Sequence, residues 1–275
     1  MCRLLGYVAT EPTTIEATIG RTALDQFSRL SRLHGDGWGT AWLDPEGVRR
    51  NTQLTYRSPS PAHSDRTFLR HTTSEPSRAR MMHLRWATPG LPIRSENTHP
   101  FTADGMSFAH NGSIMPPSSI EELLDPTFSR TLTGTTDSER YFAVIRQEFG
   151  RDPGDVVGAV RRAVLVLRAM FPIASLNALL LTRSELVIVH ANSSDDVPAL
   201  NDAVSGSGVP LDHLDKYYLV RWRRTSGGAL AFTSSGLPDD GWVPLPEDSI
   251  TRVDLQDLSM VTDLVPFGEV EAAMH

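Results

Sequence analysis

The sequence contains a single cysteine, Cys2, among its 275 residues. One cysteine cannot form an internal disulfide, and zinc frameworks that depend on several cysteines are excluded. Long apolar runs are also missing, because no stretch approaches the roughly 20 residues that a membrane-spanning helix needs. The apolar stretch 4–9 is too short for the core of a secretory signal peptide. We therefore expect a cytoplasmic protein that has no membrane partner.

Basic residues are outnumbered by acidic ones. Lysine and arginine total 26 against 33 aspartates and glutamates, which gives a net charge of -7 and a pI of about 5.7. A surface of this sign offers no general electrostatic footprint for nucleic acid. We therefore expect no nucleic-acid partner.

Signals for a bound metal or cofactor are also missing. His83, His99 and His110 have no cysteines or carboxylates at metal-ligand spacing, which favours structural hydrogen bonding for them. The glycine-rich stretch HGDGWG (34–39) lacks the Lys-Ser/Thr of a phosphate-binding loop and is typical of a tight entry into a strand. We expect no metal and no organic cofactor.

The chain does contain many short, β-rich segments separated by polar turns, a pattern typical of antiparallel hairpins. The predicted strands are Arg3–Ala9, Trp38–Leu43, Arg80–Ala87, Met106–Ala109, Leu176–Thr182, Leu186–Ala191, Tyr217–Trp222 and Ala229–Ser234. Helical periodicity predicts helices over 14–33, from the TDSE at 136–139, and over 154–171, with a short helix near 119–124. We expect one α+β domain over residues 1–275, in which helices pack against antiparallel sheets.

Cys2 directly follows Met1 and precedes an apolar, strand-like segment, so this end of the chain is expected to be tied into a core. If Met1 is removed, Cys2 carries a free α-amine beside its thiol. Reference pKa values are about 7.7–8.0 for such an amine and about 8.5 for a thiol, so the amine can take the thiol proton near neutral pH. The alternative is that Cys2 is a small buried apolar residue.

Several short motifs accompany this cysteine in a fixed order. They are Met-Cys at the start, HLRWAT at 83–88, NTHPF at 97–101, HNG at 110–112 and TDSE at 136–139. In this combination the chain resembles the class II glutamine amidotransferases, whose nucleophile is an N-terminal cysteine. The resemblance implies a four-layer αββα sandwich of two antiparallel sheets flanked by helices.

The resemblance also implies roles for individual residues. The implied catalytic residues are Cys2, Asn111 and Gly112, with Asn111 and Gly112 donating to the oxyanion. The implied substrate-binding residues are Arg85 for the α-carboxylate, Asp137 for the α-ammonium, and Trp86 and Thr88 for the shape of the pocket.

Each role has a structural alternative. Asn111-Gly112 could form a type I′ hairpin turn, and Asp137 could be a carboxylate at a helix N-terminus, where Thr136 and Glu139 have capping-box spacing. Arg85 could lie on the surface and Trp86 in the core.

The branch that the chain resembles consists of stand-alone proteins and includes the ergothioneine-pathway γ-glutamyl hydrolase. It implies cleavage of the γ-amide of glutamine or of a γ-glutamyl small molecule, through a γ-glutamyl thioester. The alternatives are a glutaminase subunit that delivers ammonia to a separate synthase, and a silent γ-glutamyl-binding module if Met1 is retained. Pro89-Gly90 and Ser235-Gly236 depart from the family pattern. A homodimer is compatible with these expectations.

Overall fold

The computed structural model describes residues 2–44, 52–88, 90–192, 217–238 and 241–265. Its strands form two sheets, with the orders β11-β9-β10-β1-β4-β2-β3 and β13-β12-β8-β7-β6-β5, in which neighbouring strands are antiparallel. The first sheet contains β1 (Arg3–Thr13), β2 (Trp38–Leu43), β3 (Gln53–Ser58), β4 (Ser77–Leu84), β9 (Val220–Arg224), β10 (Leu230–Ser234) and β11 (Val243–Pro244). The second contains β5 (Phe101–Ala103), β6 (Met106–Asn111), β7 (Asn177–Leu181), β8 (Glu185–His190), β12 (Ser249–Asp254) and β13 (Met260–Leu264).

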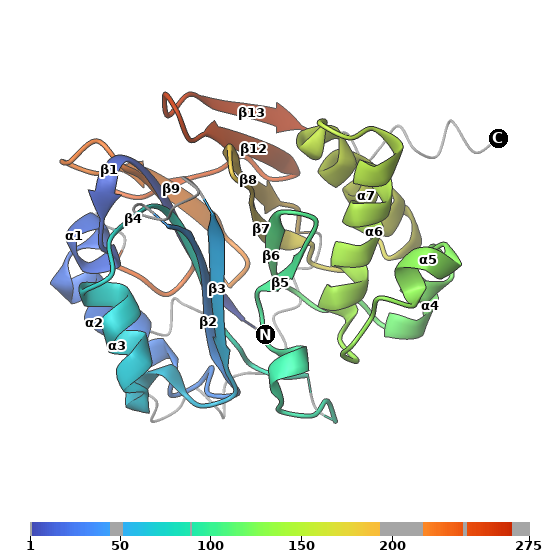
Figure 1. Cartoon of the computed structure of the whole chain (residues 1–275), viewed down its shortest axis with the longest axis horizontal. Coiled ribbons are helices and arrows are strands. Elements are labelled where there is room, and N and C mark those ends of the chain that lie inside the picture. Colours follow the sequence, from blue (N-terminus) through green and yellow to red (C-terminus); the bar gives the residue numbers. More distant parts are fainter. Residues whose placement is uncertain (1, 45–51, 89, 193–216, 239–240, 266–275) are drawn as a thin grey trace.

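Helices cover the outer face of each sheet, so the molecule has four layers (Figure 1). Beside the first sheet lie α1 (Ile15–Ile19), α2 (Arg21–Leu30) and α3 (Arg66–Thr73). Beside the second lie α4 (Pro117–Glu121), α5 (Pro126–Ser129), α6 (Asp137–Arg151) and α7 (Val156–Met170). Two short 3-10 helices, η1 (Ala62–Ser64) and η2 (Ser95–Asn97), lie in connecting segments. This arrangement confirms the predicted αββα fold class.

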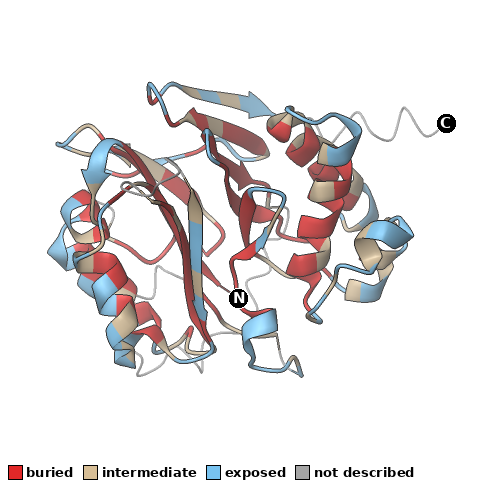
Figure 2. Ribbon diagram, in the orientation of Figure 1, coloured by how far each residue is buried: buried red, intermediate tan, exposed pale blue. Residues whose placement is uncertain are grey.

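Apolar side chains fill the spaces between all four layers. In β1, Leu4 packs between the two sheets and Leu5 packs toward the helices of the first sheet. In β7, Leu179 packs between the sheets and Leu180 packs toward the helices of the second sheet. Successive strand residues point to opposite faces, so a strand that is covered on both faces is apolar at every position. This explains the continuous runs of β7 and β8, whose burial is seen in Figure 2.

Each predicted strand overlaps a strand of the structure, but β4 ends at Leu84 and not at Ala87. The extension was wrong because the side chain of Asp36 takes the backbone N–H of Ala87, where the next strand residue would otherwise pair. β9 begins at Val220, three residues later than predicted. The short strands β3, β5 and β11, the β12–β13 hairpin and helix α3 were not predicted.

The helix predictions differ in outcome. The stretch 14–33 is two helices, because Gly20 between them has φ of 87°, outside the helical region. The helix predicted from TDSE is α6, and Oγ1 of Thr136 accepts the Glu139 backbone N–H at 3.2 Å. The helix predicted over 154–171 is α7. The short helix predicted near 119–124 begins earlier, as α4.

Strand register brings the motif residues to one end of the two sheets. Arg3, the first residue of β1, pairs with Leu84, the last residue of β4. In the second sheet, Asn111 at the end of β6 pairs with Asn177 at the start of β7. Cys2, Arg85 and Asn111 therefore lie at the same end, although they are distant in the sequence. We call it the nucleophile end.

Candidate active site

Cys2 is buried between the two sheets. Its backbone N–H donates to Oδ1 of Asn111 at 3.1 Å, and its Sγ lies 3.8 Å from the carbonyl oxygen of Trp86. The residue is 6% exposed. The thiol and the main-chain nitrogen of Cys2 are therefore both held against residues from other motifs.

Asn111 is the last residue of β6 and Gly112 follows it. The carbonyl of Asn111 accepts a hydrogen bond from Oγ of Ser175 at 3.1 Å, while its side-chain Nδ2 is buried without a hydrogen-bond partner in the described part of the chain. A Cβ on Gly112 would collide with the carbonyl oxygen of Ser175, so only glycine fits there. Neither Asn111 nor Gly112 has positive φ, which excludes the type I′ turn.

His110 ties this pair to helix α6. Its Nε2 donates to the carbonyl of Ser175 at 2.8 Å, and its Nδ1 accepts from Oγ of Ser138 at 3.0 Å. Burial lowers the pKa of His110, which favours the neutral ring that this pattern requires. His110, which precedes Asn111 and Gly112, is therefore hydrogen-bonded to Ser138, which follows Asp137.

The other two motif histidines also lie inside the protein. Nε2 of His83 donates to the carbonyl of His110 at 3.2 Å, and its ring is tilted by 32° against that of His99, with 3.9 Å between the centroids. Burial lowers the pKa of His83 to about 3 and that of His99 well below its ordinary value. For His83 and His110, the geometry agrees with the predicted structural hydrogen bonding. For His99 the prediction was wrong, because both ring nitrogens are buried without a hydrogen-bond partner in the described part of the chain. Within the described ranges, no group of three His, Cys, Asp or Glu side chains could hold a metal ion.

Arg85 is buried and not on the surface, with 2% of the residue exposed. Its guanidinium donates to the carbonyls of Asp36 and Pro92 at 3.3 and 3.4 Å, distances at the long end of hydrogen bonding. Burial lowers its pKa, while Cys2, Asp36 and Asp137 attract its charge. A buried cation with only weak carbonyl partners retains capacity for an anionic ligand.

Asp36 holds the Arg85 segment, and sequence reasoning did not find it. Its Oδ2 accepts the backbone N–H of Ala87 at 2.8 Å, and its own N–H donates to the carbonyl of Arg85 at 3.0 Å. The N–H of Arg85 in turn donates to Gly37 at 2.8 Å. HGDGWG leads into β2 as predicted. The sequence signal for the role of Asp36 was that it is the carboxylate within this glycine-rich motif.

Trp86 and Thr88 follow β4 and do not continue it. Trp86 is half-buried, its ring meets His34 edge-on at 5.5 Å, and its carbonyl faces the Cys2 thiol. Thr88 is half-buried, and its carbonyl accepts the N–H of Leu91 at 3.0 Å. The structure brings Trp86 to Cys2, whereas no hydrogen bond joins Thr88 to Cys2, Asn111 or Asp137 within the described ranges.

Asp137 is the first residue of α6 and is 5% exposed. Its Oδ2 accepts the N–H of Ile114 at 2.7 Å, and its negative charge opposes the lowering by burial of the pKa of Arg85 and of His110. A carboxylate has further lone pairs for a second donor. Asp137 is thus both a helix N-terminal carboxylate and a neighbour of Arg85.

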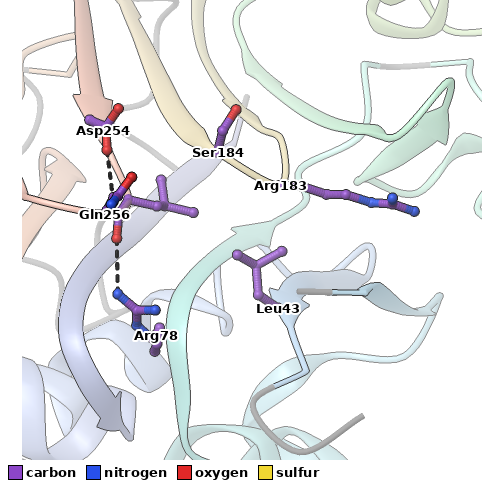
Figure 3. Close-up of a pocket in the computed structure, with 7 residues that line it drawn as sticks. Leu43, Arg78, Arg183, Ser184, Asp254 and Gln256 are labelled. Carbon is purple, nitrogen blue, oxygen red and sulfur yellow. Dashed lines mark hydrogen bonds between the residues drawn. The ribbon is translucent and has the colours of Figure 1, made fainter. Parts of the chain in front are cut away.

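A cavity of about 250 Å³ lies away from these residues, at the other end of the sheets (Figure 3). It is lined by Leu43, Arg78, Arg183, Ser184, Asp254, Leu255 and Gln256. In Figure 3 the side chain of Arg183 extends away from that of Arg78. None of the motif residues lines this cavity.

Comparison of the chain with known proteins identifies the family to which it belongs. The model of the family described as "Glutamine amidotransferases class-II" matches residues 1–197. The chain belongs to this family. Among the solved structures, the class II glutamine amidotransferase fold of this chain resembles that of a glutamine aminotransferase class-II domain protein from Silicibacter pomeroyi. The TM-score is 0.64 at 20% identity, over 96% of this chain and 99% of that one.

Curated relatives are similar over part of this amidotransferase chain. The "Probable glutamine amidotransferase DUG3" of Saccharomyces cerevisiae is 28% identical over 60% of the chain and 52% of its own length. The γ-glutamyl-hercynylcysteine sulfoxide hydrolase of Mycobacterium tuberculosis is 31% identical over 42% of the chain and 50% of its own length. The chain thus spans about half the length of these relatives. Within the described ranges, each helix is too short or too polar to span a membrane.

Proposed function

We propose that the protein is a cysteine amidohydrolase that opens the γ-amide of glutamine or of a γ-glutamyl small molecule and releases glutamate. The observation that carries this is the contact between Cys2 and Asn111. Oδ1 of Asn111 accepts from the Cys2 nitrogen, which leaves the buried Nδ2 of Asn111 as a donor without a described partner. Similarity to a γ-glutamyl hydrolase supports the substrate class.

The reaction uses Cys2 after removal of Met1. The α-amine takes the thiol proton as sulfur attacks the amide carbon, so that a C–S bond forms and the carbonyl electrons move to oxygen. When this intermediate collapses, the C–N bond breaks and the protonated α-amine gives its proton to the leaving nitrogen. Water then hydrolyses the γ-glutamyl thioester, which releases glutamate and restores the thiol.

Residues around Cys2 suit the charges of this reaction. Nδ2 of Asn111 and the backbone N–H of Gly112 are the donors for the oxyanion. The Arg85 fork binds the α-carboxylate in two parallel hydrogen bonds, and Asp137 accepts from the α-ammonium. Trp86 and Thr88 flank the glutamyl group. These groups bind both ends of a glutamyl unit and leave its side-chain carbonyl at the thiol.

The test measures glutamate released from a panel of glutamine and γ-glutamyl amides. Cys2→Ala should lower the rate by about 10³-fold or more, because no nucleophile remains. Cys2→Ser is the matched variant that keeps the size of the side chain. Full activity in Cys2→Ala would end the proposal.

Two further measurements identify the form of the activity. The intact mass of the purified protein should lack Met1, since a retained methionine blocks the α-amine and leaves a γ-glutamyl-binding module. Weak release from every amide, raised by a separate synthase, would instead indicate a subunit that supplies ammonia. Expression of residues 1–275 alone also tests whether they form one domain, as we propose.

A further inference from the structure

Arg3 is a charged residue placed directly behind the nucleophile candidate. It is the first residue of β1 and is 0% exposed. Its Nη1 donates to the carbonyl oxygen of Cys2 at 2.9 Å and to that of Tyr217 at 3.4 Å. The motif resemblance assigns it no role.

The aromatic ring of Tyr217 holds the Arg3 guanidinium in place. The carbon at the centre of the guanidinium lies 3.7 Å from the ring centroid, within the range of a cation–π interaction. The backbone around Tyr217 is also restrained, because its carbonyl accepts from Oγ of Ser235 at 2.8 Å. Neighbouring strand contacts fix β1, since Oγ of Ser234 accepts the N–H of Leu4 at 3.0 Å. The cation therefore has one defined position relative to Cys2.

We propose that Arg3 is a positioning residue for Cys2, which orients the main chain of the nucleophile through its carbonyl and favours the ionised thiol through its charge. The inference rests on the proposed function, because it assigns Arg3 to the same reaction. A single hydrogen bond to the Cys2 carbonyl restricts rotation of the residue that carries both the amine and the thiol. A fixed cation nearby also stabilises negative charge on sulfur more than the neutral thiol.

Other titratable groups also face Cys2. Arg85 follows β4, and Tyr217 and Tyr218 precede β9. Burial raises the pKa of both tyrosines, that of Tyr218 to about 12, so they are neutral near neutral pH. Arg85 is reserved for the substrate in the proposed reaction. Without substrate both arginines act on Cys2, whereas a bound α-carboxylate engages Arg85 and leaves Arg3 as the cation whose effect on Cys2 is the same in both states.

The experiment compares Arg3→Met, which removes the charge, with Arg3→Lys, which keeps it but cannot reproduce the planar fork. The first readout is alkylation of Cys2 by iodoacetamide across pH without substrate, followed by intact mass. The alkylation curve of Arg3→Met should move by about one pH unit to higher pH, and that of Arg3→Lys should stay with the unaltered protein. Intact mass also shows whether Met1 is removed in each variant.

The second readout is steady-state release of glutamate. Both variants should lose about 10-fold or more in kcat while KM changes by less than about threefold, because Arg3 does not touch the substrate. An unchanged alkylation curve in a folded, processed Arg3→Met protein would overturn the role of the charge. If Arg3→Met does not fold, the kcat of the Arg3→Lys protein tests the positioning role. An unchanged kcat in Arg3→Lys would overturn that role. If the unaltered protein releases no glutamate from any amide, the proposed function fails, yet the alkylation curves still test Arg3.

Discussion

At the nucleophile end of the sheets, Arg85 is 2% exposed and donates only long hydrogen bonds to carbonyls. At the opposite end, the side chain of Arg252 is 43% exposed and forms ion pairs with Glu185 and Asp254. Both arginines lie beside the same two-sheet core. At the opposite end, the carboxylates of Glu185 and Asp254 offset the charge of Arg252.

A buried polar group without a hydrogen-bond partner lowers the free energy of unfolding by about 1–3 kcal/mol relative to a group that has one. Each such group in a folded protein calls for an explanation, and a role in binding or catalysis is one of them. The comparison therefore teaches that carboxylates of the chain itself offset the charge of Arg252, whereas the buried Arg85 and Asn111 beside Cys2 keep hydrogen-bonding capacity for a further partner. The predictions below test that difference between the two ends.

Among the residues around Cys2, the largest effect is expected at Asn111. Asn111→Asp keeps an oxygen to accept from the Cys2 nitrogen but removes the side-chain donor, so kcat should fall by about 10²–10³-fold. Asn111→Ala removes both functions and should lose at least as much. Steady-state release of glutamate measures this, and an Asn111→Asp protein with unaltered kcat would contradict the oxyanion role.

A smaller effect is expected for Arg85→Lys. Lysine retains the charge but cannot make two parallel hydrogen bonds to a carboxylate, so KM should rise by about 10–100-fold with less change in kcat. The KM for glutamine measures this. A substrate analogue without the α-carboxylate is the control, because its kinetics should not distinguish the two proteins. A glutamine KM that does not change would remove Arg85 from the substrate site.

The buried histidines should make the nucleophile end sensitive to acid. In the unfolded chain His83 takes up a proton near its ordinary pKa of 6.5. In the folded protein burial lowers this pKa to about 3, so His83 stays neutral at pH values at which the unfolded chain is already protonated. Stability is therefore present above pH 6.5 and is lost as the pH falls through this window. One such histidine accounts for about 2 kcal/mol between pH 6.5 and 5.

Urea denaturation at several pH values measures this loss. His83→Gln keeps a donor for the His110 carbonyl and should flatten the dependence of the free energy of unfolding on pH. His63→Gln, at an exposed ring, is the matched control. An equally steep dependence in His83→Gln would contradict the assignment.

The smallest effect is expected at the opposite end. Arg183 is exposed beside the cavity of Figure 3, and Arg183→Ala should change stability by less than about 0.5 kcal/mol and leave the release of glutamate unaltered. Denaturation and activity of the same preparation measure both. A large loss of activity would show that the two ends are not independent.

Much of the fold was predictable because the signals were local. The alternation of apolar runs and polar turns located the central strands, and the spacing of Thr136 and Glu139 located the start of α6. Gly20 broke the predicted first helix through its own backbone conformation. The β12–β13 hairpin was missed because only β12 is well buried and the edge strand β13 is largely exposed, which weakens its apolar signal.

The site was predictable as a set of motifs but not as a geometry. The contact between Cys2 and Asn111 joins residues that are 109 positions apart. Asp36 and Arg3 were not among the predicted site residues, because their contacts depend on how β4 ends and on where Tyr217 lies. No spacing rule along the chain contains that information.

By itself the sequence determined the positions of the central strands, the caps of the long helices and the order of the motifs, because these depend on neighbouring residues. The tertiary structure alone decided which buried polar atoms keep a partner and which do not. Antiparallel register brings the end of β4 to the start of β1, and packing of the second sheet on the first brings Asn111 at the end of β6 against Cys2, which is 6% exposed. The reaction that we propose depends on that enclosure, because it assigns Arg85, Asn111 and Asp137 to the same small molecule as Cys2.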